Sequence, residues 1–220
     1  MISVEVILPC LDEAGALPGV LAAIPSGYRA LVVDNGSVDG SAEVAEAHGA
    51  RVVIEPRRGY GAAVHTGLEC AHADVVCVLD ADGSVDPGEL PAFVAELDRV
   101  ELGRAADLVV GRRVPAVPAA MSWHARAGNA VLAGWLRGRG IPVHDLAPVR
   151  VARRAALLEL GVRDRGSGYP LETLLRASAQ RWVIRELPVT YRPRAAGRSK
   201  VSGSIRGTLR AVRDMTAVFR

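Results

Sequence analysis

Two aspartates stand two positions apart at the end of an apolar run. The run covers residues 75–79 (VVCVL), and Asp80 and Asp82 follow it. Such a run is typical of a strand buried on both faces, and open α/β sheets bind ligands at the carboxyl ends of their strands. Two neighbouring carboxylates repel each other and need a counter-charge. The pair therefore predicts a site for a divalent cation, Mg²⁺ or Mn²⁺, holding a diphosphate; solvated loop acids are the alternative.

Acidic side chains also follow the first two strand-like segments. Residues 3–8 lead to Glu13, and residues 30–34 end at Asp34. If these segments are parallel strands of one sheet, their acids lie at the same edge as the aspartate pair. Asp34 can accept hydrogen bonds from a ribose or a nucleobase. A first-turn acid favoured by the helix dipole is the alternative role for Glu13.

A glycine-containing turn, residues 58–61 (RGYG), precedes a helix-like segment. Backbone N–H groups at the start of a helix can bind phosphate. The pattern is neither a Walker loop nor a dinucleotide fingerprint. Beside a strand that ends in two aspartates, we expect Gly59 to lie next to a diphosphate.

These residues need a sheet to bring them together, and the hydrophobic patterns predict one. Strand-like patterns lie near residues 3–8, 30–34, 51–54, 74–79, 107–110, 148–151 and 182–189. Helix-like patterns lie near residues 14–24, 40–48, 60–72, 87–99, 122–138, 153–160 and 169–181. The alternation predicts an α/β fold with a mostly parallel central sheet and helices on both faces. A chain of 220 residues, half of them hydrophobic, fits a single domain.

Positive charge is concentrated at the C-terminal end. Residues 192–220 contain eight Arg or Lys and one Asp, a net charge of +7, whereas the whole chain carries +3. Residues 201–220 predict a basic amphipathic helix, which favours an anionic partner such as a phosphate or a lipid headgroup. Docking of this helix on the domain is the alternative. Nucleic acid is not expected as a partner, because aromatic residues do not interleave with the basic ones.

Three further patterns bear on the compartment. There is no apolar run of 18 residues and no signal-peptide pattern at the N-terminus. The three cysteines lack metal-site spacing, which suits a reducing compartment. We expect a cytoplasmic protein with peripheral contact at the inner face of the membrane through residues 201–220.

Four blocks together resemble the family 2 glycosyltransferases of GT-A fold. They are residues 6–13 (VILPCLDE), 33–40 (VDNGSVDG), 58–63 (RGYGAA) and 79–83 (LDADG). Their order and spacing carry the resemblance, which covers residues 4–90. Two later blocks, residues 107–113 (DLVVGRR) and 194–200 (RAAGRSK), resemble the polyprenyl-phosphate (dolichyl-phosphate-type) hexose synthases within that family.

The resemblance implies a single GT-A (Rossmann-like) domain over residues 1–220. Its parts are a nucleotide-sugar-binding half (1–112), an acceptor-binding half (113–200) and the basic helix (201–220). Around the nucleotide it places Pro9, Leu11, Glu13, Asp34, Gly59, Asp80 and Ala81. It assigns the metal to Asp80 and Asp82, with Asp82 the direct ligand. It assigns phosphate on the donor or the acceptor to Arg112, Arg194, Ser199 and Lys200.

The implied reaction is metal-dependent, inverting transfer of a hexose from a nucleoside-diphosphate sugar to an acceptor, with Asp82 in the catalytic set. A polyprenyl phosphate is already an anion and needs only positioning by cations. A soluble hydroxyl acceptor needs a carboxylate base, for which Asp145 and Glu172 are the candidates. The basic C-terminal end favours polyprenyl phosphate. Asn35 and residues 145–150 (DLAPVR) depart from the usual family pattern, and the donor base (GDP, UDP or dTDP) stays open.

Two functions outside the glycosyltransferases remain as alternatives. Sugar-nucleotide pyrophosphorylases use a related sheet but carry a glycine-rich basic loop after the first strand. The corresponding residues 9–13 (PCLDE) are acidic here and would repel a triphosphate. A nucleotide-sugar-binding module without catalysis is disfavoured by the intact aspartate pair.

Overall fold

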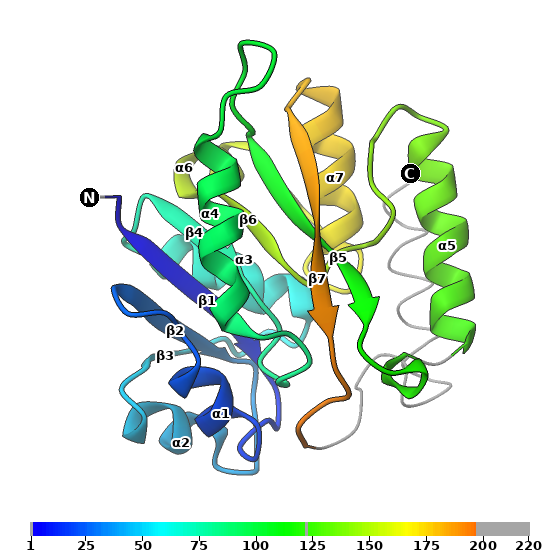
Figure 1. Cartoon of the computed structure of the whole chain (residues 1–220). Coiled ribbons are helices and arrows are strands. Elements are labelled where there is room, and N and C mark those ends of the chain that lie inside the picture. Colours follow the sequence, from blue (N-terminus) through cyan, green and yellow to red (C-terminus); the bar gives the residue numbers. More distant parts are fainter. Residues whose placement is uncertain (1, 122, 197–220) are drawn as a thin grey trace.

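Seven strands form one sheet in the order β3-β2-β1-β4-β6-β5-β7 (Figure 1). This arrangement comes from a computed structural model, which describes residues 2–121 and 123–196. The strands are β1 (Val4–Cys10), β2 (Tyr28–Asp34), β3 (Arg51–Ile54), β4 (Val75–Val78), β5 (Leu108–Pro115), β6 (Arg150–Arg153) and β7 (Ile184–Tyr191). All four residues of β4 are buried, as expected for a central strand covered on both faces.

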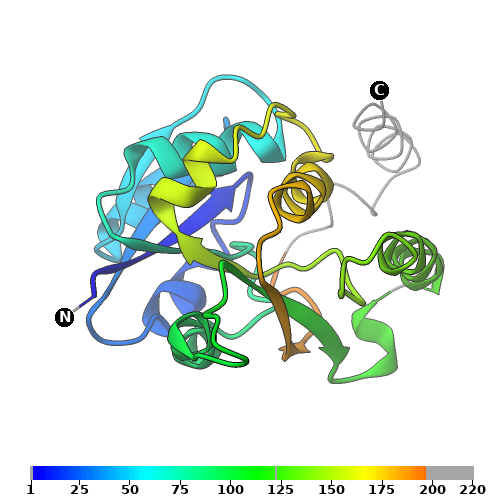
Figure 2. The same cartoon turned by 90° about the horizontal axis from the view of Figure 1, so that it is seen from above.

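Helices cover both faces of the sheet, as Figure 2 shows from above. The α-helices are α1 (Leu17–Ala22), α2 (Ser41–Ala47), α3 (Tyr60–Cys70), α4 (Leu90–Asp98), α5 (Trp123–Arg137), α6 (Arg154–Glu159) and α7 (Tyr169–Ala179). Short 3₁₀ turns, η1 (Pro87–Glu89) and η2 (Pro118–Ala120), precede α4 and α5. One core packs α1, α2 and α4 against the sheet, with Phe93 among its buried residues. The other packs α3, α5, α6 and α7, with Leu68 among its buried residues.

The directions of the strands determine which strand ends lie side by side. Strands β1, β2, β3 and β4 pair in parallel, and so do β5 and β7. Strand β6 alone runs antiparallel to both of its neighbours, β4 and β5. The prediction of a mostly parallel sheet is therefore confirmed. Because β6 is reversed, its first residue, Arg150, lies opposite Val78 at the carboxyl end of β4.

The sheet has a topological switch point between β1 and β4. The chain leaves β1 toward β2 on one side, and it returns to β4 on the other side of β1. In open α/β sheets, ligands bind outside the carboxyl ends of the strands at such a point. The residues that follow β1 and β4 are therefore the ones to inspect for a site.

The predicted elements are confirmed, with shifts at their ends. The strand expected at 107–110 continues to Pro115, and the one expected at 148–151 covers Arg150–Arg153. The first helix is shorter than 14–24, because the loop before it is bound to the start of α2. There, the amide of Glu13 donates to Ser41 Oγ at 2.9 Å.

The predicted helix at 201–220 lies outside the described residues, and the division into two halves stays a prediction. Within residues 2–121 and 123–196, no helix is both long and apolar enough to cross a lipid bilayer.

Candidate active site

Asp82 lies in the loop after β4 with 4% of its surface exposed. Its Oδ1 accepts a hydrogen bond from the amide of Ser84 at 2.8 Å, and its Oδ2 accepts one from Arg194 Nη1 at 2.6 Å. Gly83 has a φ of +73°, which favours glycine because other residues are strained there. The carboxylate is therefore fixed in place by a tight turn and a guanidinium.

The same guanidinium joins Asp82 to the loop after β1. Arg194 Nη2 donates to Glu13, whose side chain is only 8% exposed. Glu13 and Asp82 thus share one cation, although 69 positions of sequence separate them. This confirms the prediction that acids after β1 and β4 gather at one edge of the sheet.

Asp80 is partly buried and carries an unusual charge environment. Burial, together with the neighbouring Asp82, raises the pKa of Asp80 from 3.8 to about 6. Three arginines, Arg150, Arg113 and Arg194, partly offset this effect. The site therefore still disfavours a second negative charge after the protein's own cations are counted. An added cation would relieve that repulsion.

Arg150 is a buried cation that the sequence analysis did not identify. Only 4% of its surface is exposed, and its Nη2 donates to the hydroxyl of Tyr60 at 2.5 Å. Its Nη1 donates to the carbonyl of Ala147 at 3.2 Å. Tyr60 also interacts with Asp80, and burial raises the pKa of the Tyr60 phenol to about 12. A single arginine within the apolar sequence 148–152 (PVRVA) was the available signal, since a buried cation requires a buried anion.

Asp34 is the last residue of β2, Asn35 follows it, and the two side chains make different contacts. Both carboxylate oxygens of Asp34 accept from the amide of Ser37, at 3.1 and 3.3 Å. Asp34 pairs with Cys10, so it lies at the carboxyl end of β1. The side-chain Nδ2 of Asn35 donates to the backbone carbonyls of Glu55 and Arg57 at 2.9 and 2.7 Å. Asn35 therefore holds the loop between β3 and α3.

The glycine turn before α3 is occupied by protein contacts. The amide of Gly59 donates to Asn35 Oδ1 at 2.8 Å, and the amides of Gly61 and Ala62 donate to carbonyls at 3.0 and 2.8 Å. A Cβ at Gly59, where φ is +148°, would come within 2.1 Å of the carbonyl oxygen of Arg165. These amides therefore bind the protein itself, and the position of Gly59 next to a diphosphate stays a prediction.

The remaining residues assigned to the nucleotide flank the same edge. Pro9 is the penultimate residue of β1 and pairs with Val33. Leu11 is half-buried in the loop that follows β1. Ala81 is buried between the two aspartates. Their roles toward a nucleotide stay predictions.

Asp145 lies before β6 and is 2% exposed. Its Oδ2 accepts from the backbone amide and the Nε of Arg113, each at 2.8 Å, and its Oδ1 accepts from Arg113 Nη2 at 2.5 Å. Three charge-assisted or backbone hydrogen bonds from one residue thus hold this carboxylate in place.

Glu172 stands in the first turn of α7 and accepts four hydrogen bonds from three donor groups. These are the amides of Arg163 and Asp164, at 3.0 and 2.6 Å, and the Nε of Arg176, at 2.5 Å; the Arg163 amide reaches both oxygens. Burial raises the pKa of Glu172, but these donors outweigh burial and leave the pKa below its ordinary value of 4.5. The carboxylate therefore fixes the loop before α7, and its role as a catalytic base stays a prediction.

Arg112 lies in β5 toward the same edge, with 47% of its side chain exposed. Its Nε is 3.7 Å from Glu186 Oε2, while Glu186 also accepts from the amide and the Nδ1 of His144, at 2.6 and 2.8 Å. Arg112 is thus loosely paired and open to solvent. Ser199 and Lys200, the other residues assigned to phosphate, lie outside the described residues.

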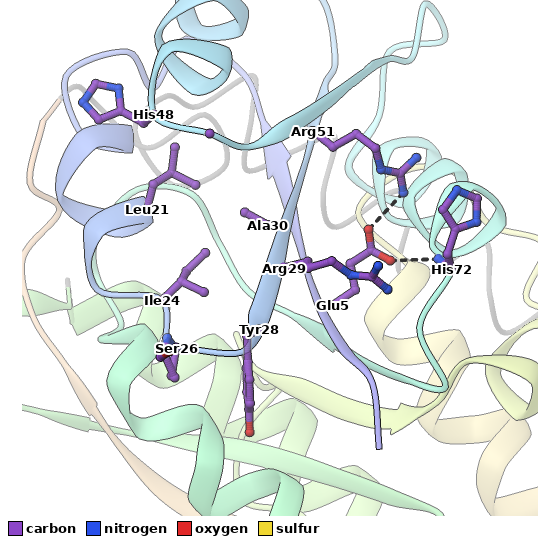
Figure 3. Close-up of a pocket in the computed structure, with 12 residues that line it drawn as sticks. Glu5, Leu21, Ile24, Ser26, Tyr28, Arg29, Ala30, His48, Arg51 and His72 are labelled. Atoms are coloured by element: carbon purple, nitrogen blue, oxygen red, sulfur yellow. Dashed lines mark hydrogen bonds and ion pairs between the residues drawn. The ribbon is translucent and has the colours of Figure 1, made fainter. Parts of the chain in front are cut away.

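A cavity of about 470 Å³ lies at the opposite edge of the sheet (Figure 3). Its lining includes Glu5, Tyr28 and Arg51, which stand at the amino ends of β1, β2 and β3. Glu5 is tied there by Arg51 and by the amide of His72. The cavity is therefore separate from the acidic carboxyl edge.

The sheet order, the reversed β6 and the buried acids at the switch point define an α/β enzyme of the GT-A fold class. The family model described as glycosyl transferase family 2 matches residues 5–136. An uncharacterized glycosyltransferase of Mycobacterium tuberculosis is 58% identical over 218 residues, which cover 99% of this chain and 98% of that protein. The chain belongs to glycosyl transferase family 2, and it is a glycosyltransferase.

Two further comparisons bear on the predictions. A dolichyl-phosphate hexose transferase of Haloferax volcanii is 33% identical over 196 residues, covering 86% of this chain and 83% of that protein. The crystal structure of glucosyl-3-phosphoglycerate synthase from M. tuberculosis, in complex with Mn²⁺, uridine diphosphate and glucosyl-3-phosphoglycerate, matches with a TM-score of 0.74 at 24% identity. That match covers 99% of this chain and 78% of the other. The predicted family and GT-A fold are both confirmed.

Proposed function

We propose that this glycosyltransferase moves a hexosyl residue from a nucleoside-diphosphate sugar to a polyprenyl phosphate, with a divalent cation bound at Asp80 and Asp82. The observation that carries the choice of acceptor is the state of the two candidate bases. Asp145 is held by Arg113, and Glu172 accepts hydrogen bonds from the backbone of the loop before α7 and from Arg176 within α7. An acceptor that is already an anion needs neither of them.

The aspartate pair fits a divalent cation. Carboxylate oxygens are the ligands that Mg²⁺ prefers, and it completes its shell with water and substrate phosphates. Burial and the neighbouring Asp82 both raise the pKa of Asp80, so a cation held between the two carboxylates would favour their charged forms. The related glucosyl-3-phosphoglycerate synthase was crystallised with Mn²⁺ or Mg²⁺ together with uridine diphosphate. When bound, the cation would neutralise charge that develops on the departing diphosphate.

Two buried arginine atoms support an anionic ligand at the same place. In the described part of the chain, Arg150 Nε and Arg194 Nε are buried and have no hydrogen-bond partner. Buried polar groups without partners are rare in folded proteins. Both arginines lower the pKa of Asp80 through their positive charge, so they lie close to it. Phosphate oxygens entering this edge of the sheet would therefore find hydrogen-bond donors there.

The residues at the ends of β1 and β2 would bind the nucleoside. Among the described residues, Asp34 accepts from the backbone of Ser37, and its oxygens keep capacity for a ribose hydroxyl. Asn35 would act indirectly, because it holds the loop 55–59 against the end of β2. Pro9, Leu11 and Ala81 would shape the walls. Arg112 would face the acceptor phosphate from β5, together with Ser199 and Lys200.

The family relative named for transfer to dolichyl phosphate favours a lipid-linked acceptor. The structural relative is named for phosphoglycerate, a soluble acceptor that carries both a phosphate and a hydroxyl. A hydroxyl acceptor would require Asp145 to accept a proton while it remains paired with Arg113. We therefore place the soluble acceptor second.

Two experiments test the proposal. A thermal-shift screen of nucleoside diphosphates with and without Mn²⁺ should raise the melting temperature for one base only when the metal is present, since ligands that bind the native state stabilise it. Radiolabelled sugar of that nucleotide is then offered with polyprenyl phosphate or with 3-phosphoglycerate. Label in the lipid phase supports the proposal. Label only in the soluble acceptor refutes the lipid acceptor.

We further propose that the protein works in the cytoplasm, at the inner face of the membrane, and touches it through residues 201–220. The support is the sequence alone, with its basic and apolar faces. Flotation of the full chain with anionic vesicles should exceed flotation with neutral vesicles, and the difference should fall as salt rises. Equal flotation with both would contradict this contact.

A further inference from the structure

We propose that Arg194 is a tethered counter-ion that takes the place of the metal in the nucleotide-free enzyme, so that a divalent cation binds firmly only together with the nucleoside diphosphate. This inference rests on the proposed function, because it concerns the same aspartate pair. Arg194, which lies 112 positions from Asp82 in the sequence, would set the order in which nucleotide and metal bind.

The first support is the fork of hydrogen bonds made by Arg194. One terminal nitrogen donates to Asp82 Oδ2 at 2.6 Å, and the other donates to Glu13. The two carboxylate side chains are 6% and 8% exposed, and the arginine side chain is 22% exposed. Charge-assisted bonds of this kind are strong, and water screens them weakly at such burial. A metal ion approaching Asp82 would meet this guanidinium, and the two cations would repel each other.

The second support is the anchoring of the backbone on both sides of Arg194. The amide of Arg192 donates to the carbonyl of Ser84 at 2.8 Å, and the amide of Ala195 donates to the carbonyl of Asp82 at 2.9 Å. The segment therefore runs alongside the loop after β4 as a continuation of β7.

Close packing holds the same segment. A Cβ placed on Gly83 would lie 2.9 Å from the Cβ of Ala195, and one on Gly15 would lie 3.0 Å from the Cβ of Ala196. There is no room for larger side chains at these two contacts. The backbone at Arg194 is therefore fixed to the loops after β1 and β4, so exchange needs a movement of the long side chain only.

The charges make the exchange depend on nucleotide. A metal ion that enters alone would put a second cation on Asp82 beside Arg194, and the two would repel each other. A diphosphate changes this balance, because its oxygens can accept the guanidinium fork in place of the carboxylates. Arg194 would then move to phosphate and leave Asp82 free to hold the metal. Nucleotide and metal should therefore raise each other's affinity by the same factor, as linkage requires.

The test measures Mn²⁺ binding to the full-length, nucleotide-free protein by the loss of the free-ion EPR signal. Arg194→Gln should bind Mn²⁺ about 10-fold more tightly than the wild type, a typical coupling between sites. The gain in Mn²⁺ affinity on adding the nucleoside diphosphate should shrink in this variant. Arg192→Gln is the matched control. It lies in the same segment but is 54% exposed and pairs with Asp86, so its Mn²⁺ affinity should equal that of the wild type.

The outcomes separate this inference from the proposed function. Unchanged or weaker Mn²⁺ binding in Arg194→Gln, with nucleotide-dependent binding intact in the wild type, overturns the inference alone. Absence of Mn²⁺ binding to the wild type with every nucleoside diphosphate overturns the proposed function and the inference with it. If Arg194→Gln does not fold, Arg194→Lys decides. Its ammonium can hold only one carboxylate at a time, so a smaller rise in Mn²⁺ affinity is expected, and no rise contradicts the inference.

Discussion

Arg113 and Asp145 form a two-pronged ion pair at the carboxyl edge of the sheet. The Nε and Nη2 of the arginine lie 2.8 and 2.5 Å from the two carboxylate oxygens, and the backbone amide of Arg113 adds a third bond. The Asp145 side chain is 3% exposed. The pair joins β5 to the segment that leads into β6, and its stability decides how Asp145 can act in catalysis.

Replacing Asp145 by Asn should mainly affect stability. The variant leaves Arg113 without its charged partner, and we expect a loss of about 1–3 kcal/mol in the free energy of unfolding. With polyprenyl phosphate as acceptor, the shape of the pH–rate profile should not change, because no base is required. Disappearance of the acidic limb would instead identify Asp145 as a base. Asp98→Asn, at an exposed ion pair with Arg153, should cost less than about 1 kcal/mol.

Replacing Asp82 by Asn should lower turnover by at least ~100-fold, judging from the loss of single electrostatic stabilisers in other enzymes. The physical reason is that Asp82 would bind the cation that neutralises the leaving diphosphate. Steady-state rates at saturating Mn²⁺ measure this. Asp86→Asn, whose side chain is 35% exposed in the following loop, is the control and should retain its rate. Near-normal metal-dependent turnover in Asp82→Asn would contradict the assignment.

Replacing Asn35 by Asp should loosen the loop between β3 and α3. The carboxylate cannot donate to the carbonyls of Glu55 and Arg57, and it places negative charge against both. We expect a loss of about 1–3 kcal/mol in stability, together with a raised KM for the donor. Urea denaturation and donor kinetics measure the two effects. Val38→Asp adds the same charge at an 88% exposed position of the neighbouring loop and should have little effect.

Replacing Tyr60 by Phe should destabilise the buried arginine of β6. The hydroxyl of Tyr60 is the acceptor for Arg150 Nη2 at 2.5 Å, and its loss leaves a buried charged donor unpaired. The expected cost is about 1–3 kcal/mol in the free energy of unfolding. Tyr28→Phe, a half-buried tyrosine at the amino edge of the sheet, is the matched control and should change stability by less than about 0.5 kcal/mol. Equal stability of both variants would show that the Tyr60 contact is unimportant.

Replacing Glu172 by Gln should reveal a pH-dependent structural role. The folded protein lowers the pKa of Glu172 below 4.5, so this carboxylate contributes stability above about pH 4.5 and loses that contribution as the pH falls through the lowered pKa. The stability difference between wild type and variant should therefore be largest near pH 7 and shrink in acid. Denaturation curves at pH 7, 5 and 4 measure it. A difference that grows in acid would contradict this assignment.

Local sequence patterns were enough to predict the sheet, its helices and the acidic side chains at one edge of the sheet. The apolar run before Asp80 marks a buried strand, and parallel strands carry their loops to a common edge, so Glu13, Asp34 and Asp82 could be grouped from sequence alone. These inferences depend on periodicity over a few residues and on a rule that holds for all such sheets. They also carried the family resemblance that the comparisons confirmed.

The tertiary structure alone decided which charges are paired. Arg194 reaches Glu13 across 181 positions, and Arg150 reaches Tyr60 across 90, because β7 continues beside the loop after β4 and β6 runs in reverse. No local pattern encodes such contacts, since they depend on strand order and direction across the whole sheet. For the same reason Glu172 is a candidate base on sequence alone, whereas only the fold shows that its carboxylate accepts hydrogen bonds from the backbone at 163–164 and from Arg176.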